Sequence, residues 1–163
     1  MIRINSVSHV WSIICTNSVI DQETNNLNLF NLIEKLTLTI PEQELQKVKE
    51  SGAKGIMFPF SLEVVNRFKK NKKGETVAFD FRLKLLNPAG EALITNERRV
   101  ALKKEIDNMR VRTRLGPPLP VDKSGDYSIV IEFKDVDEER YTEAEVVPLE
   151  VIIQAGPNQP QQA

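Results

Sequence analysis

The sequence predicts a mainly β protein, an antiparallel β-sandwich of about eight strands with one short helix, of the immunoglobulin-like or C2-like type. Short segments rich in β-branched and aromatic residues alternate apolar and polar side chains, as strands with one buried face do. Turn-forming residues separate these segments at short intervals. The sequence Gly125-Asp-Tyr127 is typical of a sandwich corner, where a phenol bonds back to the preceding loop.

Three segments carry the alternation most clearly: Ser124–Phe133, Val77–Leu85 and Val146–Ile153. Their apolar residues recur with the period of two that places side chains on one face of a strand. We therefore expect the three strands to be companions and their inward faces to form the core. The predicted inward side chains are Tyr127, Ile129, Ile131 and Phe133; Val77, Phe79, Phe81, Leu83 and Leu85; and Val147, Leu149, Val151 and Ile153.

The first part of the chain opens with a strand. Val10–Ile20 has apolar residues on both faces, as expected of a central strand, and Trp11 and Cys15 are interpreted as core residues. Leu27–Leu36 begins with strand-like alternation and ends with the three-residue spacing of a helical turn. Thr37–Ile40 is extended and β-branched, which predicts another strand.

One helix is predicted at Pro41–Ser51. Pro41 suits the first helical position, acidic residues follow in the first turn, lysines occupy the last turn, and Gly52 can cap the end. A helix of about ten residues is marginal in isolation, so we expect it to dock on the sandwich or fray.

The middle of the chain predicts shorter elements. Ile56–Phe68 is a strand interrupted by Pro59, which favours an edge or a bend. Arg67–Glu75 is a basic hairpin loop, Gly116–Pro120 is a Pro-rich loop, and Asp135–Thr142 is an acidic connection. Further short strands are predicted at Ala92–Thr95, Arg99–Lys104 and Met109–Leu115.

Length and composition fit one domain. Of the 163 residues, 1–154 form the predicted β-sandwich domain, and 155–163 form a Pro/Gln-rich tail that we expect to be disordered. A net charge of −1 gives no general attraction to nucleic acid or to an anionic membrane. The N-terminus lacks the pattern of a signal peptide, and no apolar run approaches the roughly 20 residues of a membrane span. A cytoplasmic location without membrane association is therefore predicted.

Three blocks of sequence resemble a family of small uncharacterised bacterial β-sandwich proteins, a domain of unknown function. They are the segment Cys15–Leu36, the turn Leu85–Gly90, and the sequence Ser124–Tyr127 followed by Pro148–Val151. The resemblance covers about residues 8 to 153. It implies a sandwich opened by a strand with an aspartate-led turn and closed by a Gly-x-Tyr strand, and it implies no activity.

Residue types that carry chemistry are scarce. His9 is the only histidine and Cys15 the only cysteine, so a typical zinc site is not indicated, and any Ser-His-Asp or Cys-His site would have to use His9. No nucleophile elbow or phosphate-binding glycine loop is present. We therefore predict that the chain is not an enzyme and uses no cofactor. An alternative is a calcium- or ligand-binding module of the C2-like or carbohydrate-binding-like type, motivated by the acidic residues Asp135, Asp137, Glu138 and Glu139.

Basic residues gather at two places. The candidate partner-binding residues are Lys69, Lys70, Lys72 and Lys73 at the loop, and Arg110, Arg112 and Arg114 on one face of a strand. Either neighbouring strands pair these charges on a solvated face, or the guanidinium groups form a docking surface for carboxylates or phosphates. A basic nucleic-acid-binding face is a weaker alternative, because the interleaved aromatic residues of a single-strand platform are missing.

The function predicted from the sequence is therefore a non-enzymatic binding or assembly module, acting in a bacterial or phage-related protein complex. A protein partner is expected and a homo-oligomer is left open.

Overall fold

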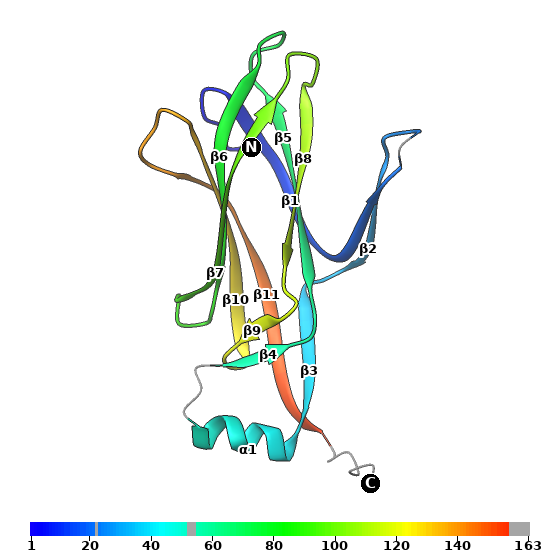
Figure 1. The fold of residues 1–163 in the computed structure, drawn as a ribbon, viewed down its shortest axis with the longest axis vertical. Coiled ribbons are helices and arrows are strands. Elements are labelled where there is room, and N and C mark those ends of the chain that lie inside the picture. Colours follow the sequence, from blue (N-terminus) through cyan, green and yellow to red (C-terminus); the bar gives the residue numbers. More distant parts are fainter. Residues whose placement is uncertain (22, 52–54, 157–163) are drawn as a thin grey trace.

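Two β-sheets facing each other make up the body of the protein. The structure, a computed structural model, describes residues 1–21, 23–51 and 55–156. A small third sheet and one helix lie at one end of the sandwich (Figure 1). The mainly β fold with one short helix is confirmed. The described residues hold eleven strands, however, and not about eight.

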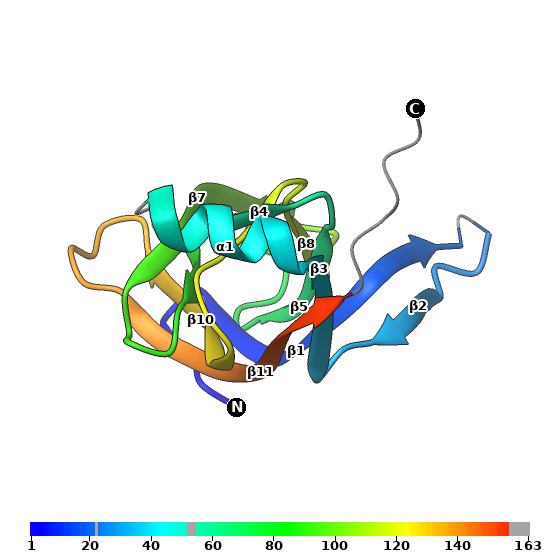
Figure 2. The same cartoon turned by 90° about the horizontal axis from the view of Figure 1, so that it is seen from below.

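The first sheet is antiparallel throughout, with the strand order β2-β1-β5-β8. The second half of β1 and all of β2 form a hairpin that projects from the body (Figures 1 and 2). Since β1 lies between β2 and β5, the predicted central strand is confirmed. The bounds are Val7–Ile20 for β1, Leu27–Leu32 for β2, Leu62–Lys70 for β5 and Asn108–Leu115 for β8.

The second sheet has the strand order β3-β11-β10-β6-β7. Its central strand β10 pairs with β11 and β6, which confirms the predicted companions of Ser124–Phe133. The pairing of β3 with β11 is parallel, so the sandwich is not wholly antiparallel as expected. The bounds are Lys35–Pro41 for β3, Val77–Leu86 for β6, Ala92–Leu102 for β7, Gly125–Asp135 for β10 and Thr142–Gly156 for β11.

The small sheet and the helix cover the end of the sandwich where the Gly-x-Tyr corner lies. Strands β4 (Ile56–Phe58) and β9 (Leu119–Val121) pair antiparallel. The helix α1 spans Glu42–Ser51, so the predicted helix is confirmed, although Pro41 ends β3 and does not begin the helix. The predicted cap, Gly52, lies outside the described residues.

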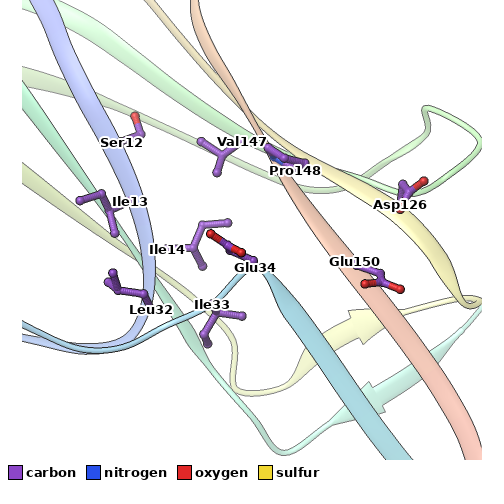
Figure 3. A pocket seen from close by; sticks show the side chains of 10 residues that line it. All are labelled: Ser12, Ile13, Ile14, Leu32, Ile33, Glu34, Asp126, Val147, Pro148 and Glu150. Carbon is purple, nitrogen blue, oxygen red and sulfur yellow. The ribbon is translucent and has the colours of Figure 1, made fainter.

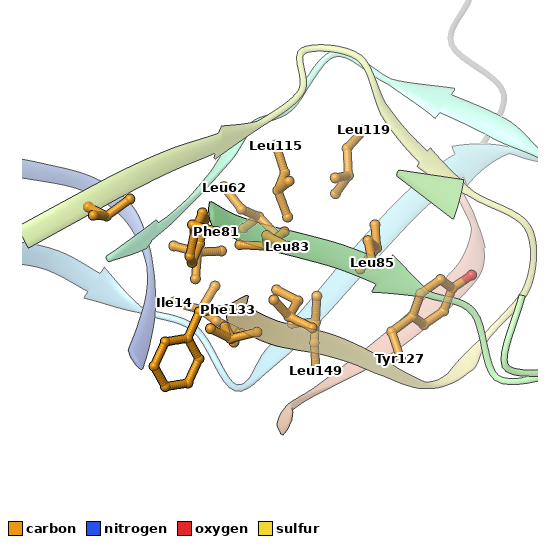
Figure 4. Packing of buried hydrophobic residues seen from close by; sticks show 14 of the residues in the cluster. Ile14, Leu62, Phe81, Leu83, Leu85, Leu115, Leu119, Tyr127, Phe133 and Leu149 are labelled. Carbon is orange, nitrogen blue, oxygen red and sulfur yellow. The ribbon is translucent and has the colours of Figure 1, made fainter. Parts of the chain in front are cut away.

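The core forms between the inward faces of the two sheets (Figure 4). On β6, Phe79, Phe81 and Leu83 are fully buried, as the alternation predicts. Phe68 of β5 packs against Phe79 with ring centroids 4.8 Å apart, so aromatic rings join the two sheets. On β11, Leu149 and Val151 are buried, while Val147 and Ile153 pack partly buried against the core.

Several local predictions are wrong for identifiable reasons. The helical turn within Leu27–Leu36 is absent, because β2 ends at Leu32 and the chain crosses directly to β3 in the other sheet. The strands predicted at Ala92–Thr95 and Arg99–Lys104 form one strand, β7. The loop Arg67–Glu75 is not a hairpin, since its flanking strands belong to different sheets.

Other errors concern single positions. Trp11 is only half-buried and lies outside the core cluster, because it points to the outer face of the first sheet. Leu119–Val121, within and after the predicted Pro-rich loop, is a strand. Ala155 and Gly156 belong to β11 and not to the predicted tail, of which residues 157–163 lie outside the described residues.

The Gly-x-Tyr corner is confirmed in detail. Tyr127 is 1% exposed, and its hydroxyl accepts hydrogen bonds from the amides of Asp122 and Lys123. It can donate to the Asp122 carboxylate or the Lys123 carbonyl. Gly125 has φ +146°, and a Cβ there would meet the Pro88 ring at 2.8 Å, so the corner requires glycine. Burial, followed by the Asp122 carboxylate, raises the pKa of Tyr127 to about 12.

We predict that Tyr127→Phe destabilises the protein by about 2 kcal/mol, because the partly buried amide and carboxylate partners lose their hydrogen bonds to the hydroxyl while the ring stays in place. Urea denaturation of wild type and variant would measure the loss. Tyr141→Phe is the matched control at the only other tyrosine, which is half-buried, and should change stability by less than about 0.5 kcal/mol. Equal effects of the two changes would contradict the corner's role.

Candidate functional site

The arginine row consists of Arg110, Arg112 and Arg114 on β8. The intervening Val111, Thr113 and Leu115 are buried, so the three guanidinium groups point to the outer face of the first sheet, as the sequence predicts. This outer face is not an open surface. The β1–β2 hairpin curves alongside it, and two of the arginines reach the hairpin.

Each arginine of the row has a different partner. Arg110 donates to the carbonyl of Asn25 in the hairpin turn at 3.1 Å. Arg112 donates to the carbonyl of Ser18 on β1 at 3.1 Å. Arg114 forms an ion pair with Glu63 of β5 at 3.0 Å. The row therefore holds the hairpin at a fixed distance from the body, a structural role that the sequence does not reveal.

The carboxylate of Glu63 lies beneath the contact between the arginine row and the hairpin. Glu63 is 5% exposed, and it accepts hydrogen bonds from the Ser18 hydroxyl and from Arg114. Burial by itself would raise the pKa of Glu63, but these two hydrogen bonds and the charge of Arg112 outweigh it, and the pKa lies below its usual value. Glu63 is therefore ionised and matches the charge of Arg114.

A pocket that we call the hairpin cleft opens between the hairpin and β8. Its volume is about 320 Å³. It combines two guanidinium groups, two amide side chains and three apolar residues. The lining residues are Ile20, Asn25, Arg67, Ile106, Asn108, Met109 and Arg110.

The lysines of the β5–β6 loop divide into two kinds. Lys69, Lys72 and Lys73 are exposed and available to a partner. Lys70 is 2% exposed, and its ammonium donates to the carbonyls of Glu75, Lys103 and Lys104. The prediction that Lys70 belongs to a partner-binding surface is therefore wrong. The strand alternation that points Lys69 outward points Lys70 inward, where it joins two loops.

We predict that Lys70→Met destabilises the fold by about 2–4 kcal/mol, since the carbonyls of two loops lose the buried, charged donor that joins them. Lys72→Met changes an exposed lysine of the same loop and should stay within about 0.5 kcal/mol of wild type. Chemical denaturation of both variants would test this. A Lys70→Met protein as stable as Lys72→Met would show that the ammonium contributes nothing to the fold.

A second pocket, which we call the apolar groove, lies where the chain crosses from one sheet to the other. It has a volume of about 440 Å³. Figure 3 shows Ile14 of β1 on one side and Val147 and Pro148 of β11 on the other. The connection between β2 and β3 lines the groove. It is held on both sides, because the Ile33 amide donates to the Ile14 carbonyl of β1 and the Glu150 amide of β11 donates to the Glu34 carbonyl.

The rim of the groove is acidic and its wall is apolar. Glu34, Asp126 and Glu150 are exposed at the rim, and Glu150 forms an ion pair with Lys35 at 3.2 Å. Leu32, at the end of β2, is 63% exposed beside it. Sequence reasoning missed this groove. The only signal was the uncharged segment Leu27–Leu32, which has neither the lysine nor the proline that commonly protects an edge strand.

One residue of the predicted acidic connection, Asp135 at the end of β10, has a structural role. Both carboxylate oxygens of Asp135 accept hydrogen bonds, from the amides of Asn5 and Ser6. Within residues 1–21, 23–51 and 55–156, no group of three or more His, Cys, Asp or Glu side chains is arranged to hold a metal ion.

The outer face of the second sheet carries paired charges. Glu132 of β10 forms ion pairs with Arg82 and Lys84 of β6. Arg99 of β7 pairs with Asp80 of β6 at 2.9 Å. Neighbouring strands thus match these charges across the outer face of this sheet.

His9 lies buried where β1 approaches β11. Its Nε2 is 2.8 Å from the Ser12 hydroxyl and 3.5 Å from the Glu145 carboxylate. The Ser12 hydroxyl also lies 2.7 Å from Asn66 Oδ1, to which it can donate. Serine and glutamate therefore approach the same ring nitrogen. This arrangement differs from a hydrolase triad, in which the acid bonds Nδ1 and the serine hydroxyl bonds Nε2.

We predict that His9 makes the fold less stable at acid pH. Burial, only partly opposed by Glu145, lowers the pKa of His9 from 6.5. The unfolded chain therefore takes up a proton first as the pH falls below 6.5, and stability decreases down to the folded pKa. Urea denaturation at about pH 7.5 and about pH 5 should show that the free energy of unfolding decreases more for wild type than for His9→Gln. Identical losses would contradict the prediction.

Comparison with other proteins gives structural likeness only. No family model matches the chain, and no curated protein matches it. Among solved structures, the C-terminal domain of Wzt has a TM-score of 0.49 and 11% identity over 89% of this chain and 72% of that chain. A family 123 glycoside hydrolase from Clostridium perfringens has a TM-score of 0.45 and 11% identity over 90% of this chain and 28% of that chain. Neither likeness supplies an activity or a partner.

The described helix is also too short to cross a membrane, and none of the residues that the structure describes forms a membrane-spanning helix.

Proposed function

We propose that this chain is a non-enzymatic binding or assembly module that acts in the cytoplasm, within a bacterial or phage-related protein complex. Its sandwich would be of the immunoglobulin-like or C2-like type. The observation that supports the proposal best is the exposure of large apolar side chains on a projecting edge strand, beside an apolar groove.

The β1–β2 hairpin carries these side chains. Phe30 is 50% exposed, Leu32 63% and Val19 46%. The strand β2 is the last of its sheet, so one row of its backbone amides and carbonyls has no strand beside it among the described residues. An uncharged, apolar edge strand is a template for pairing with another chain.

The occupant that fits this surface is an extended segment of a partner protein. Such a segment could add a strand to the edge of β2 and place apolar side chains in the groove. The acidic rim formed by Glu34 and Asp126 favours a partner with basic residues at the flanks of that segment. Burial of the apolar side chains would supply the affinity of the partner segment, and its charged flanks would fix its position along β2.

The geometry of His9 supports a role other than hydrolysis. The Glu145 carboxylate approaches Nε2, the same ring nitrogen that faces the Ser12 hydroxyl, whereas the acid of a hydrolase triad bonds Nδ1.

The partner surface can be tested with Phe30→Ser/Leu32→Ser. We expect tagged wild-type protein to retain a discrete partner, and the purified partner to bind the double variant at least about tenfold more weakly, since each exposed apolar residue buried on binding is worth about 1–2 kcal/mol. Titration calorimetry with the purified partner would measure the change.

Met57→Ser is the matched control, because Met57 is 65% exposed on β4, away from the hairpin. It should bind like wild type. Equal binding by the double variant would exclude the hairpin surface. A monomer that retains no partner and shows activity in a hydrolase screen would exclude the proposed function.

A further inference from the structure

Two arginines lie directly opposite each other at the hairpin cleft. Arg67 of β5 and Arg110 of β8 are register partners in the antiparallel pair and point to the same outer face. Like charges at directly opposed positions destabilise a sheet. The next pairs along the same strands are compatible, because Arg112 faces Val65 and Arg114 faces Glu63. The Arg67–Arg110 pair therefore destabilises the sheet locally, and the other two pairs do not.

No carboxylate relieves this repulsion. Among the ion pairs of the described residues, none includes Arg67 or Arg110. Two nearby carboxylates are already engaged. Glu63 binds Ser18 and Arg114, and Asp21 in the hairpin turn accepts from the amides of Glu23 and Thr24. The remaining cation of this face, Lys69, lies two residues beyond Arg67 and adds to the positive charge.

Most donors of the pair remain available. Arg110 uses one nitrogen, Nη1, for the carbonyl and side chain of Asn25. Arg67 approaches the Asn108 side chain at 3.5 Å, the limit of a hydrogen bond. A guanidinium group has five donors in a planar fork that matches the oxygens of phosphate. Two such forks on facing strands can hold one anion from two sides.

The surroundings of the pair also suit a ligand. The cleft of about 320 Å³ is at the lower end of the size range for small-molecule sites. Ile20 and Ile106 provide an apolar wall next to the guanidinium groups. Asn25 and Asn108 place amide side chains beside them, which can donate to further oxygens.

We propose that the hairpin cleft binds the phosphoryl group of a small phosphate monoester that carries an apolar body. Arg67 and Arg110 hold the dianion, and the wall of Ile20 and Ile106 holds the apolar part. The ligand offsets the repulsion between the two arginines. This site shares no residue with the apolar groove, so it stands independently of the proposed partner surface.

The test titrates the full chain with phenyl phosphate, inorganic phosphate and benzoate, at ionic strength held constant with chloride. Trp11, the only tryptophan, is the register neighbour of Arg67 on β1, so its fluorescence reports on the site. We expect saturable binding of phenyl phosphate. Inorganic phosphate should bind at least about fivefold more weakly without the apolar part, and benzoate at least about tenfold more weakly with a single charge.

Arg110→Gln separates binding from folding. Removing one guanidinium should weaken phenyl phosphate binding at least about tenfold. Removal of the like-charge pair offsets the loss of the hydrogen bonds to Asn25, so the melting temperature without phosphate should stay close to that of wild type. Arg114→Gln is the control on the same strand. It breaks the ion pair with Glu63, so it should lower the melting temperature and leave phosphate binding unchanged.

Several results would overturn the proposal. If phenyl phosphate changed the Trp11 fluorescence no more than chloride of the same ionic strength does, no phosphate site would exist. Benzoate binding as tightly as phenyl phosphate would exclude phosphoryl recognition, and inorganic phosphate binding as tightly would exclude the apolar wall. Unchanged binding of phenyl phosphate by Arg110→Gln would make Arg110 a purely structural residue.

Discussion

Burial of apolar side chains between two sheets is the constraint on which the rest of the structure depends. The chain has one cysteine, so no disulfide within it joins the sheets, and packing must hold them together. The period of two along β6, β10 and β11 directs Phe, Leu, Ile and Val inward on every strand. Aromatic rings of β5 and β6 then interlock across the interface. A sandwich packed in this way still has open ends and edges, where backbone groups need partners.

Polar side chains close these openings. Lys70 joins two loops at one end of the sandwich, and the Tyr127 hydroxyl closes the corner at the other. Arg98 of β7 reaches across to β8, where it donates to the Arg112 carbonyl and the Thr113 hydroxyl. His9 of β1 approaches Glu145 of β11 at the opposite edge. In each case a side chain crosses between segments that backbone pairing leaves unconnected.

The sequence predicts what depends on alternation and fails where a contact is long-range. The strands β6, β10 and β11 and their inward faces follow from periodicity, and Gly125 with Tyr127 identifies the corner, because both signals are local. The burial of Lys70 depends on carbonyls of a loop more than thirty residues away. The contact of Arg112 with Ser18 depends on how the hairpin curves. Neither the groove nor the Arg67–Arg110 pair is visible until the register is known.

The hairpin is the part of the molecule that stability alone does not explain. A fold selected only for stability would bury Phe30 and Leu32 or replace them with polar residues, and it would not set Arg67 opposite Arg110. Both exceptions lie on or beside the same element. Arg110 touches the hairpin turn and also lines the cleft, so a ligand that draws Arg110 toward Arg67 changes a contact that positions the hairpin. If both proposed sites are occupied in the protein, their affinities are linked to the same extent in both directions, since coupling through a shared element is reciprocal.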